Sequence, residues 1–199
     1  MIDYRRIFVH NRRWARRKRV MQPGFFKRHF SEQKPDFLYI GCSDSRVSIE
    51  KLMGVDIGEV FVHRNIANIV DEDDDNIKAV IQYAVDVLGV QHIVVSGHTG
   101  CGGIKASLEE GQAGAIDKWL KKIKKVYYKY QSRLEKIDDK AKMLDEYSKL
   151  NVLEQCRNIE KLPCVKKKKE ETGFPIVHPW MYNMSNGHLC DLHKQKNIL

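Results

Sequence analysis

The chain has 199 residues, of which 42% are hydrophobic and 31% charged, as expected for one well-packed globular domain and unlike a low-complexity or fibrous protein. Its apolar runs are far shorter than the roughly twenty residues of a membrane span, so we expect no membrane partner. The formal net charge of +9 favours contact with anions but does not decide the fold.

The N-terminal segment is rich in arginine and carries the apolar residues Ile7, Phe8 and Trp14, which predicts a helical arm over residues 1–32. It lacks the apolar stretch of a secretory signal, although an Arg-rich organellar targeting segment remains a minority alternative. Five cysteines, an odd number, are unlike a disulfide framework. We therefore expect a reducing, cytoplasmic location.

Beyond the arm, apolar runs and amphipathic segments alternate. Strands are expected at residues 37–40, 60–62 and 93–95, with a hairpin formed by 175–182 and 188–192. Helices are expected at 49–53, 77–88, 116–134 and 141–159, the second of them after an acidic, solvent-exposed cap at 71–75. This order predicts a single α/β domain with a largely parallel sheet flanked by helices, a core at 33–192 and a tail at 193–199.

Two segments follow directly after predicted parallel strands: Cys42-Ser43-Asp44-Ser45-Arg46 and His98-Thr99-Gly100-Cys101-Gly102-Gly103. Ligands bind at this carboxyl edge in open α/β sheets. Cys42, His98 and Cys101 offer two sulfurs and one nitrogen, a set that suits zinc with a fourth position left open. Taken singly, Cys42 could equally be a buried structural thiol, and His98 is more often a histidine satisfied by backbone. The combination predicts a site.

These two segments together resemble the β-class carbonic anhydrases. The resemblance extends to Phe61-Val62-His63-Arg64-Asn65-Ile66-Ala67-Asn68, Gln82-Tyr83-Ala84-Val85, His10-Asn11-Arg12-Arg13-Trp14 and His178-Pro179-Trp180-Met181-Tyr182. It implies zinc-dependent, reversible hydration of carbon dioxide to bicarbonate and a proton through attack by zinc-bound hydroxide. It also implies a homodimer or homotetramer in which the N-terminal arm packs on a neighbouring subunit.

The resemblance further implies a role for each matching residue. Cys42, His98 and Cys101 would bind one Zn²⁺ per subunit, and Asp44, paired with Arg46, would orient the hydroxide or become the fourth ligand in a closed site. Substrate would meet Gln33, Phe61, Ile66, Tyr83 and Gly102. A bicarbonate regulatory pocket would use Tyr39, Arg64 and Tyr182, and is only partly kept because position 39 is not tryptophan. His63 and His92 are candidate proton shuttles, although an ordinary surface histidine is the commoner role.

The sequence departs from the family pattern at Ser48, commonly proline, and at Pro179, commonly glycine. Three alternatives stay open: hydrolysis of carbonyl sulfide or carbon disulfide, a bicarbonate sensor without catalysis, and a nucleic-acid-binding zinc protein. The intact ligand and Asp44–Arg46 set disfavours the sensor. Nucleic acid is not an expected partner, because the basic residues are not interleaved with exposed aromatic residues in any clear motif. Cys156, Cys164 and Cys190 are interpreted as packing or incidental residues.

Overall fold

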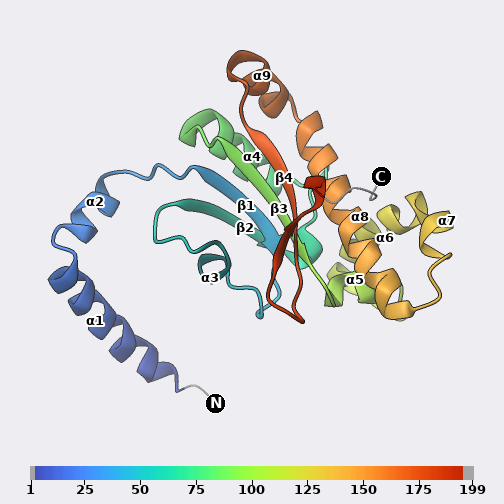
Figure 1. The fold of residues 1–199 in the computed structure, drawn as a ribbon, viewed down its shortest axis with the longest axis horizontal. Helices are drawn as coiled ribbons and strands as arrows, with labels where there is room; N and C mark the ends of the chain where they lie inside the picture. Colours follow the sequence, from blue (N-terminus) through green and yellow to red (C-terminus); the bar gives the residue numbers. More distant parts are fainter. Residues whose placement is uncertain (1–2, 195–199) are drawn as a thin grey trace. The chain divides into compact units, whose positions relative to one another are not determined.

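The computed structural model describes residues 3–194, which fall into two compact units, one within Met1–Lys34 and the other within Pro35–Leu199 (Figure 1). The boundary follows Lys34, close to the predicted end of the arm at residue 32. Of the predicted tail at 193–199, residues 195–199 lie outside the described residues. Within residues 3–194, no helix is long and apolar enough to cross a bilayer.

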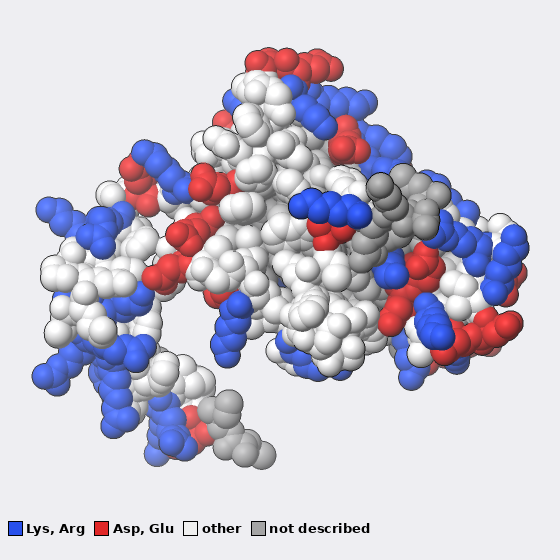
Figure 2. Space-filling model, viewed as in Figure 1, with Lys and Arg blue, Asp and Glu red and all other residues white. Residues whose placement is uncertain are grey.

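The first unit is helical, as predicted, and consists of α1 (Tyr4–Met21) and α2 (Phe25–Ser31). The Asp3 side chain caps α1 by accepting a hydrogen bond from the Arg5 backbone N–H. Trp14 packs edge to face against Phe26 with ring centroids 5.7 Å apart, and this contact joins the two helices. Lys and Arg side chains cover much of α1 (Figure 2).

The second unit alternates strands and helices, as the sequence predicts. Its elements are β1 (Phe37–Cys42), α3 (Ile49–Met53), β2 (Val60–Asn65), η1 (Ile66–Asn68), α4 (Asp75–Gln82), η2 (Tyr83–Leu88), β3 (His92–His98), α5 (Gly102–Ala106), α6 (Gly114–Lys129), α7 (Gln131–Leu134), α8 (Lys140–Lys161), α9 (Pro163–Thr172), β4 (Ile176–Tyr182), β5 (Leu189–Asp191) and η3 (Leu192–Lys194). The helix expected at 77–88 is α4 continued by the wider π-helical turn η2.

The sheet has the strand order β2-β1-β3-β4-β5 (Figure 1). The first four strands are parallel, and β5 pairs antiparallel with β4 as the predicted hairpin. Gly41 lies opposite Ser96, and His98 lies opposite Tyr182, so β1, β3 and β4 end at the same edge. The prediction of a largely parallel α/β fold is confirmed, and this edge carries the site.

One face of the sheet packs against α4, η2 and α8 to form the main core. Its largest group of buried side chains includes Leu38, Ile40, Ile77, Ile81, Ile93, Val95, Val152 and Ile159. Burying each such side chain contributes about 1.5–3 kcal/mol. A Cβ at Gly97 would lie 2.6 Å from the Val152 side chain, so α8 can approach β3 this closely only because residue 97 is glycine.

One expectation about local structure needs correction, and one helix was not anticipated. The acidic run at 71–75 is not entirely solvent-exposed: Asp74 caps α4 by accepting from the Asn76 N–H, but Asp71 is buried and pairs with Lys122 at 3.3 Å. The helix α9 was not predicted. Val165 is its only buried residue, so it lacks the apolar periodicity by which amphipathic helices are recognised.

Candidate metal centre

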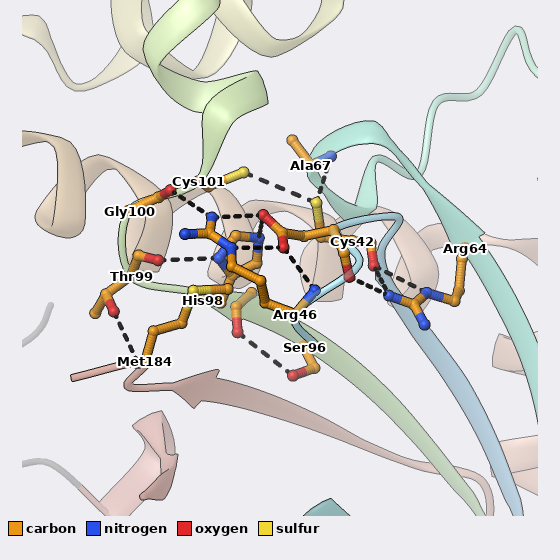
Figure 3. Close-up of polar contacts among 12 residues, drawn as sticks. Cys42, Arg46, Arg64, Ala67, Ser96, His98, Thr99, Gly100, Cys101 and Met184 are labelled. Carbon is orange, nitrogen blue, oxygen red and sulfur yellow. Dashed lines mark hydrogen bonds and ion pairs between the residues drawn. The ribbon is translucent and has the colours of Figure 1, made fainter. Parts of the chain in front are cut away.

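Three potential metal ligands converge at the carboxyl edge of the sheet. Cys42 is the last residue of β1, His98 is the last residue of β3, and Cys101 is the N-cap residue of α5. Their ligand atoms all lie within 4.8 Å of one another, and all three residues are buried (Figure 3). The structure therefore brings together the set that the sequence singles out, because parallel pairing of β1 with β3 places the two strand ends side by side.

The His98 ring is oriented by its own neighbour. Its Nδ1 lies 2.9 Å from the Thr99 carbonyl oxygen. Because a carbonyl only accepts hydrogen bonds, Nδ1 must carry the proton, and the lone pair then resides on Nε2. Nε2 is buried without a hydrogen-bond partner among the described residues. An unpartnered buried nitrogen beside two sulfurs is costly by itself and fits a ligand to a metal ion.

The two cysteines share a hydrogen bond, with their sulfurs 3.9 Å apart. This bond lowers the pKa of the Cys42 thiol and, together with burial, raises the pKa of Cys101. The Ala67 N–H also donates to Cys42 Sγ at 3.4 Å. The pair therefore favours one thiolate, the form of cysteine that binds metal. Two sulfurs and one imidazole match the three protein ligands of a catalytic zinc site, which would leave one position for water.

A salt bridge lies beside this cluster. Arg46 donates from Nε to Asp44 Oδ1 at 2.9 Å and from Nη2 to Asp44 Oδ2 at 2.7 Å. These bonds lower the pKa of the Asp44 carboxyl well below its usual range. Asp44 Oδ2 is 3.8 Å from His98 Nε2, so the carboxylate borders the ligand set. Arg64 holds the loop by donating to the backbone oxygens of Cys42 and Asp44.

A cavity of about 360 Å³ opens next to the cluster. Its lining combines Cys42 and Asp44 with the apolar side chains of Ile66, Ala106, Ile116 and Leu120, and with Ser43, Gly102 and Gly103. A mixed wall of this kind suits a small apolar molecule that must meet a polar reaction centre. A Cβ at Gly103 would lie 2.5 Å from Ile66 Cγ2, so η1 can pack on α5 only with glycine there.

The residues implied for substrate binding are distributed over several places. Ile66 and Gly102 line the cavity. Phe61 and Tyr83 instead pack on each other, with ring centroids 5.9 Å apart, and do not line it. Gln33 belongs to the first unit and is exposed. The substrate-binding roles of these five residues stay predictions.

The three residues implied for the bicarbonate regulatory pocket have separate surroundings. Tyr39 is buried with its ring over Gly41, and its hydroxyl has no hydrogen-bond partner among the described residues. The Arg64 guanidinium is engaged with the Asp44 loop. Tyr182 lies at the end of β4, opposite His98. Within residues 3–194, no hydrogen bond joins any two of these three residues, and the pocket stays a prediction.

The two candidate proton shuttles differ in position. His92 is the first residue of β3 and His98 the last, so the two lie at opposite edges of the sheet. Because it lies at the opposite edge, His92 cannot act as a proton shuttle for the cluster of its own chain. Its Nδ1 is instead 3.0 Å from His178 Nε2. His63 is half-buried next to Asn65, and burial lowers its pKa. Its role stays a prediction.

Sequence reasoning missed some residues that shape the cluster. Ala67 donates to Cys42 from a left-handed backbone conformation, and Asn151 of α8 donates to the Ala67 carbonyl oxygen at 2.9 Å. A left-handed alanine leaves no mark in the sequence. A signal for Asn151 exists: asparagine and glutamine, Asn151 and Gln155, interrupt the buried face of a helix four residues apart.

Comparison with known proteins agrees with this geometry. A family profile described as carbonic anhydrase matches residues 37–189. A carbonic anhydrase of Emericella nidulans is 46% identical over 187 residues, which cover 94% of this chain and 82% of that protein. One of Saccharomyces cerevisiae is 32% identical, covering 91% and 85%. A structure of tetrameric β-carbonic anhydrases of Sordaria macrospora aligns with a TM-score of 0.90 at 37% identity, covering 95% of this chain and 96% of that one.

Proposed function

The chain belongs to the β-carbonic anhydrase family and is a carbonate dehydratase, and from this premise we propose that it hydrates carbon dioxide on a zinc ion held by Cys42, His98 and Cys101. The observation that carries the proposal is the convergence of these three buried ligand atoms, with His98 Nε2 lacking a hydrogen-bond partner among the described residues. When bound, zinc would supply Lewis-acid activation of a water molecule.

The Asp44–Arg46 pair would serve this reaction as a fixed hydrogen-bond acceptor. Because Arg46 keeps the pKa of Asp44 low, the carboxylate stays ionised at neutral pH and can accept a hydrogen bond from the attacking water. Its lone pairs would orient the water's oxygen toward the substrate. The apolar cavity wall, including Ile66, would hold carbon dioxide, and the Gly102 backbone N–H would meet the anionic product.

We further propose a homodimer or homotetramer. Ile57, Val62 and Tyr83 expose apolar side chains on or near the edge strand β2 and η2, and Tyr4 and Phe8 do so on α1. Exposed apolar groups on an edge strand favour burial against another chain. The Sordaria macrospora relatives are tetrameric. Packing of the arm on a neighbouring subunit would cover the side chains on α1.

We also propose a reducing, cytoplasmic location, because the candidate metal site contains two cysteines. All five cysteines are free, and the sulfurs of Cys42 and Cys101 are 3.9 Å apart. A modest movement would bring them to the disulfide length of about 2.05 Å. An oxidising compartment would therefore threaten the ligand set.

Turnover of carbon dioxide, carbonyl sulfide and carbon disulfide by one preparation tests this function. We expect carbon dioxide hydration to dominate and to disappear in Cys42→Ser together with bound zinc. A protein that turns over only the sulfur compounds would overturn the substrate assignment and leave the zinc site standing. An inactive wild-type protein with a full complement of zinc would support the sensor alternative instead.

A further inference from the structure

The turn that follows β2 has an unusual backbone. Ala67 and Asn68 have φ values of 63° and 49°, in the left-handed region that residues with a Cβ rarely adopt. Such conformations persist only where the surrounding structure holds them. Both residues are buried. Ala67 packs against α5, so closely that a Cβ added to Gly103 would lie 3.3 Å from the Cβ of Ala67.

Side chains hold this turn at successive backbone groups. Trp119 Nε1 of α6 donates to the Ile66 carbonyl oxygen at 2.9 Å, and Asn151 Nδ2 of α8 donates to that of Ala67 at 2.9 Å. The Asn65 side chain accepts from the Ile69 N–H at 2.7 Å. The Ala67 N–H shares a peptide group with the Ile66 carbonyl that Trp119 holds, whereas the Ala67 carbonyl held by Asn151 belongs to the next peptide group. The two contacts together fix the peptide groups on both sides of Ala67, and its N–H is directed at Cys42 Sγ (Figure 3).

Asn151 is itself fixed. Its side chain is 1% exposed, and its Oδ1 accepts from Gln155 Nε2 at 3.0 Å. Gln155 Oε1 in turn accepts from the Val70 N–H at 2.9 Å. The direction of the amide of Asn151 follows from its partners, because the Ala67 carbonyl only accepts and must face the NH₂ group. A buried chain of hydrogen bonds thus links α8 to the Ala67 carbonyl, and the N–H of the same residue donates to the sulfur of a candidate ligand.

We propose that Asn151 is a positioning residue of the metal centre, which holds Ala67 in its left-handed conformation so that the Ala67 N–H withdraws charge from the Cys42 thiolate. The inference rests on the proposed zinc site. Two thiolates donate more charge than imidazoles and weaken the Lewis acidity of a metal. A hydrogen bond to one sulfur counteracts this donation, as partners of metal ligands commonly do.

The test compares Asn151→Leu with a matched control, Asn158→Leu. Asn158 lies on the same helix and donates to the Val70 carbonyl oxygen and, at 3.3 Å, to Gln155 Oε1, but it has no hydrogen bond to Ala67 among the described residues. Its replacement therefore removes a half-buried amide from the same network without removing the contact to Ala67. Each protein would be loaded with cobalt(II) to record the thiolate-to-metal charge-transfer band, and its zinc affinity would be measured by competition with a chelator.

For Asn151→Leu we expect the band to move to longer wavelength, because the thiolate becomes a better donor. Its zinc affinity should nevertheless fall about tenfold, because the turn that positions Cys42 is no longer held. Asn158→Leu should keep the wild-type band and affinity. An Asn151→Leu protein with a wild-type band, or equal changes in both variants, would overturn the proposal. A wild-type chain that binds neither metal would instead refute the zinc site itself.

A measurement on the wild-type protein covers the case in which Asn151→Leu does not fold. In protein loaded with cadmium-113 and labelled with nitrogen-15 at alanine, the Ala67 amide proton should show scalar coupling to the metal through Cys42 Sγ. The alanine amides without sulfur partners in the structure provide the internal control. Coupling at Ala67 alone among them would support the hydrogen bond, and its absence would overturn it.

Discussion

Arg46 binds both carboxylate oxygens of Asp44, at 2.9 Å from Nε to Oδ1 and 2.7 Å from Nη2 to Oδ2. A two-point contact of this kind fixes the direction of the carboxylate as well as its charge. Because Asp44 also lies 3.8 Å from His98 Nε2, the fixed acceptor is placed next to the candidate metal ligands. The proposed role of Asp44 in catalysis depends on this geometry.

Asp44→Asn should therefore keep zinc and lose activity. The amide cannot pair with Arg46 through two accepting oxygens, and it presents an NH₂ group where the water needs an acceptor. We expect carbon dioxide hydration to slow by about 10²–10⁴-fold, with zinc content unchanged. Arg46→Lys keeps the positive charge but cannot bind both carboxylate oxygens at once, so its hydration rate should lie between those of the wild type and Asp44→Asn. Loss of zinc from Asp44→Asn would show that the aspartate is chiefly structural.

The Asp44–Arg46 pair also predicts a pH dependence of stability. The pKa of Asp44 is lowered, chiefly by its hydrogen bonds with Arg46, so the stabilisation is present above the ordinary carboxyl pKa of about 3.9 and is lost as pH falls through the lower, folded value. Arg46 is mostly exposed, which limits the contribution to about 1 kcal/mol or less.

Chemical denaturation of the wild type and Asp44→Asn should accordingly give a constant difference in unfolding free energy from pH 6 to 9. The difference should shrink only below about pH 4. A difference that vanishes near pH 6 would mean that Asp44 titrates in the neutral range. Any change of hydration rate between about pH 7 and 8.5 is then attributed to the metal-activated water rather than to Asp44.

Neighbouring glycines of α5 provide a prediction about packing. A Cβ at Gly103 would lie 2.5 Å from Ile66 Cγ2, whereas a Cβ at Gly102 would meet nothing within 4 Å. Gly103→Ala should destabilise the fold by about 1–3 kcal/mol and lower zinc affinity, because η1 must move away from α5. Gly102→Ala should do neither. Equal midpoints of urea unfolding for the two variants would contradict this packing.

Inhibition by bicarbonate should be modest. The Arg64 guanidinium already donates to the backbone oxygens of Cys42 and Asp44, and the side chain at position 39 is a buried tyrosine. Both features leave little for an anion to bind in the implied regulatory pocket. Hydration rates measured with and without bicarbonate decide this. A steep, cooperative loss of activity with bicarbonate below pH 8 would contradict it.

Much of the fold follows from the sequence because its signals are local. The apolar runs that become β1 and β3 end at Cys42 and His98, and parallel strands bring such ends to one edge. The helix α9 could not be predicted in this way because most of its residues are exposed. Its four consecutive lysines, Lys166 to Lys169, interrupt any periodic spacing of apolar residues.

The convergence of Cys42, His98 and Cys101 could be predicted, but the groups that orient this cluster could not. Ala67 reaches Cys42 only through a left-handed turn, and that turn depends on Asn151, which is distant in sequence. Asp71 was expected in solvent because acidic runs usually are, yet Lys122 of α6 packs over it. Contacts of this kind are set by tertiary packing, to which local patterns do not extend.

Stepwise return of zinc to chelator-treated protein, with carbon dioxide hydration recorded at each addition, tests directly whether zinc at this cluster is responsible for the activity. From this assignment we expect a linear rise in rate that stops at one zinc per chain, and no rise in Cys42→Ser or His98→Ala. Full activity of the chelated protein, or a site filled with one zinc per chain and no hydration, would contradict it.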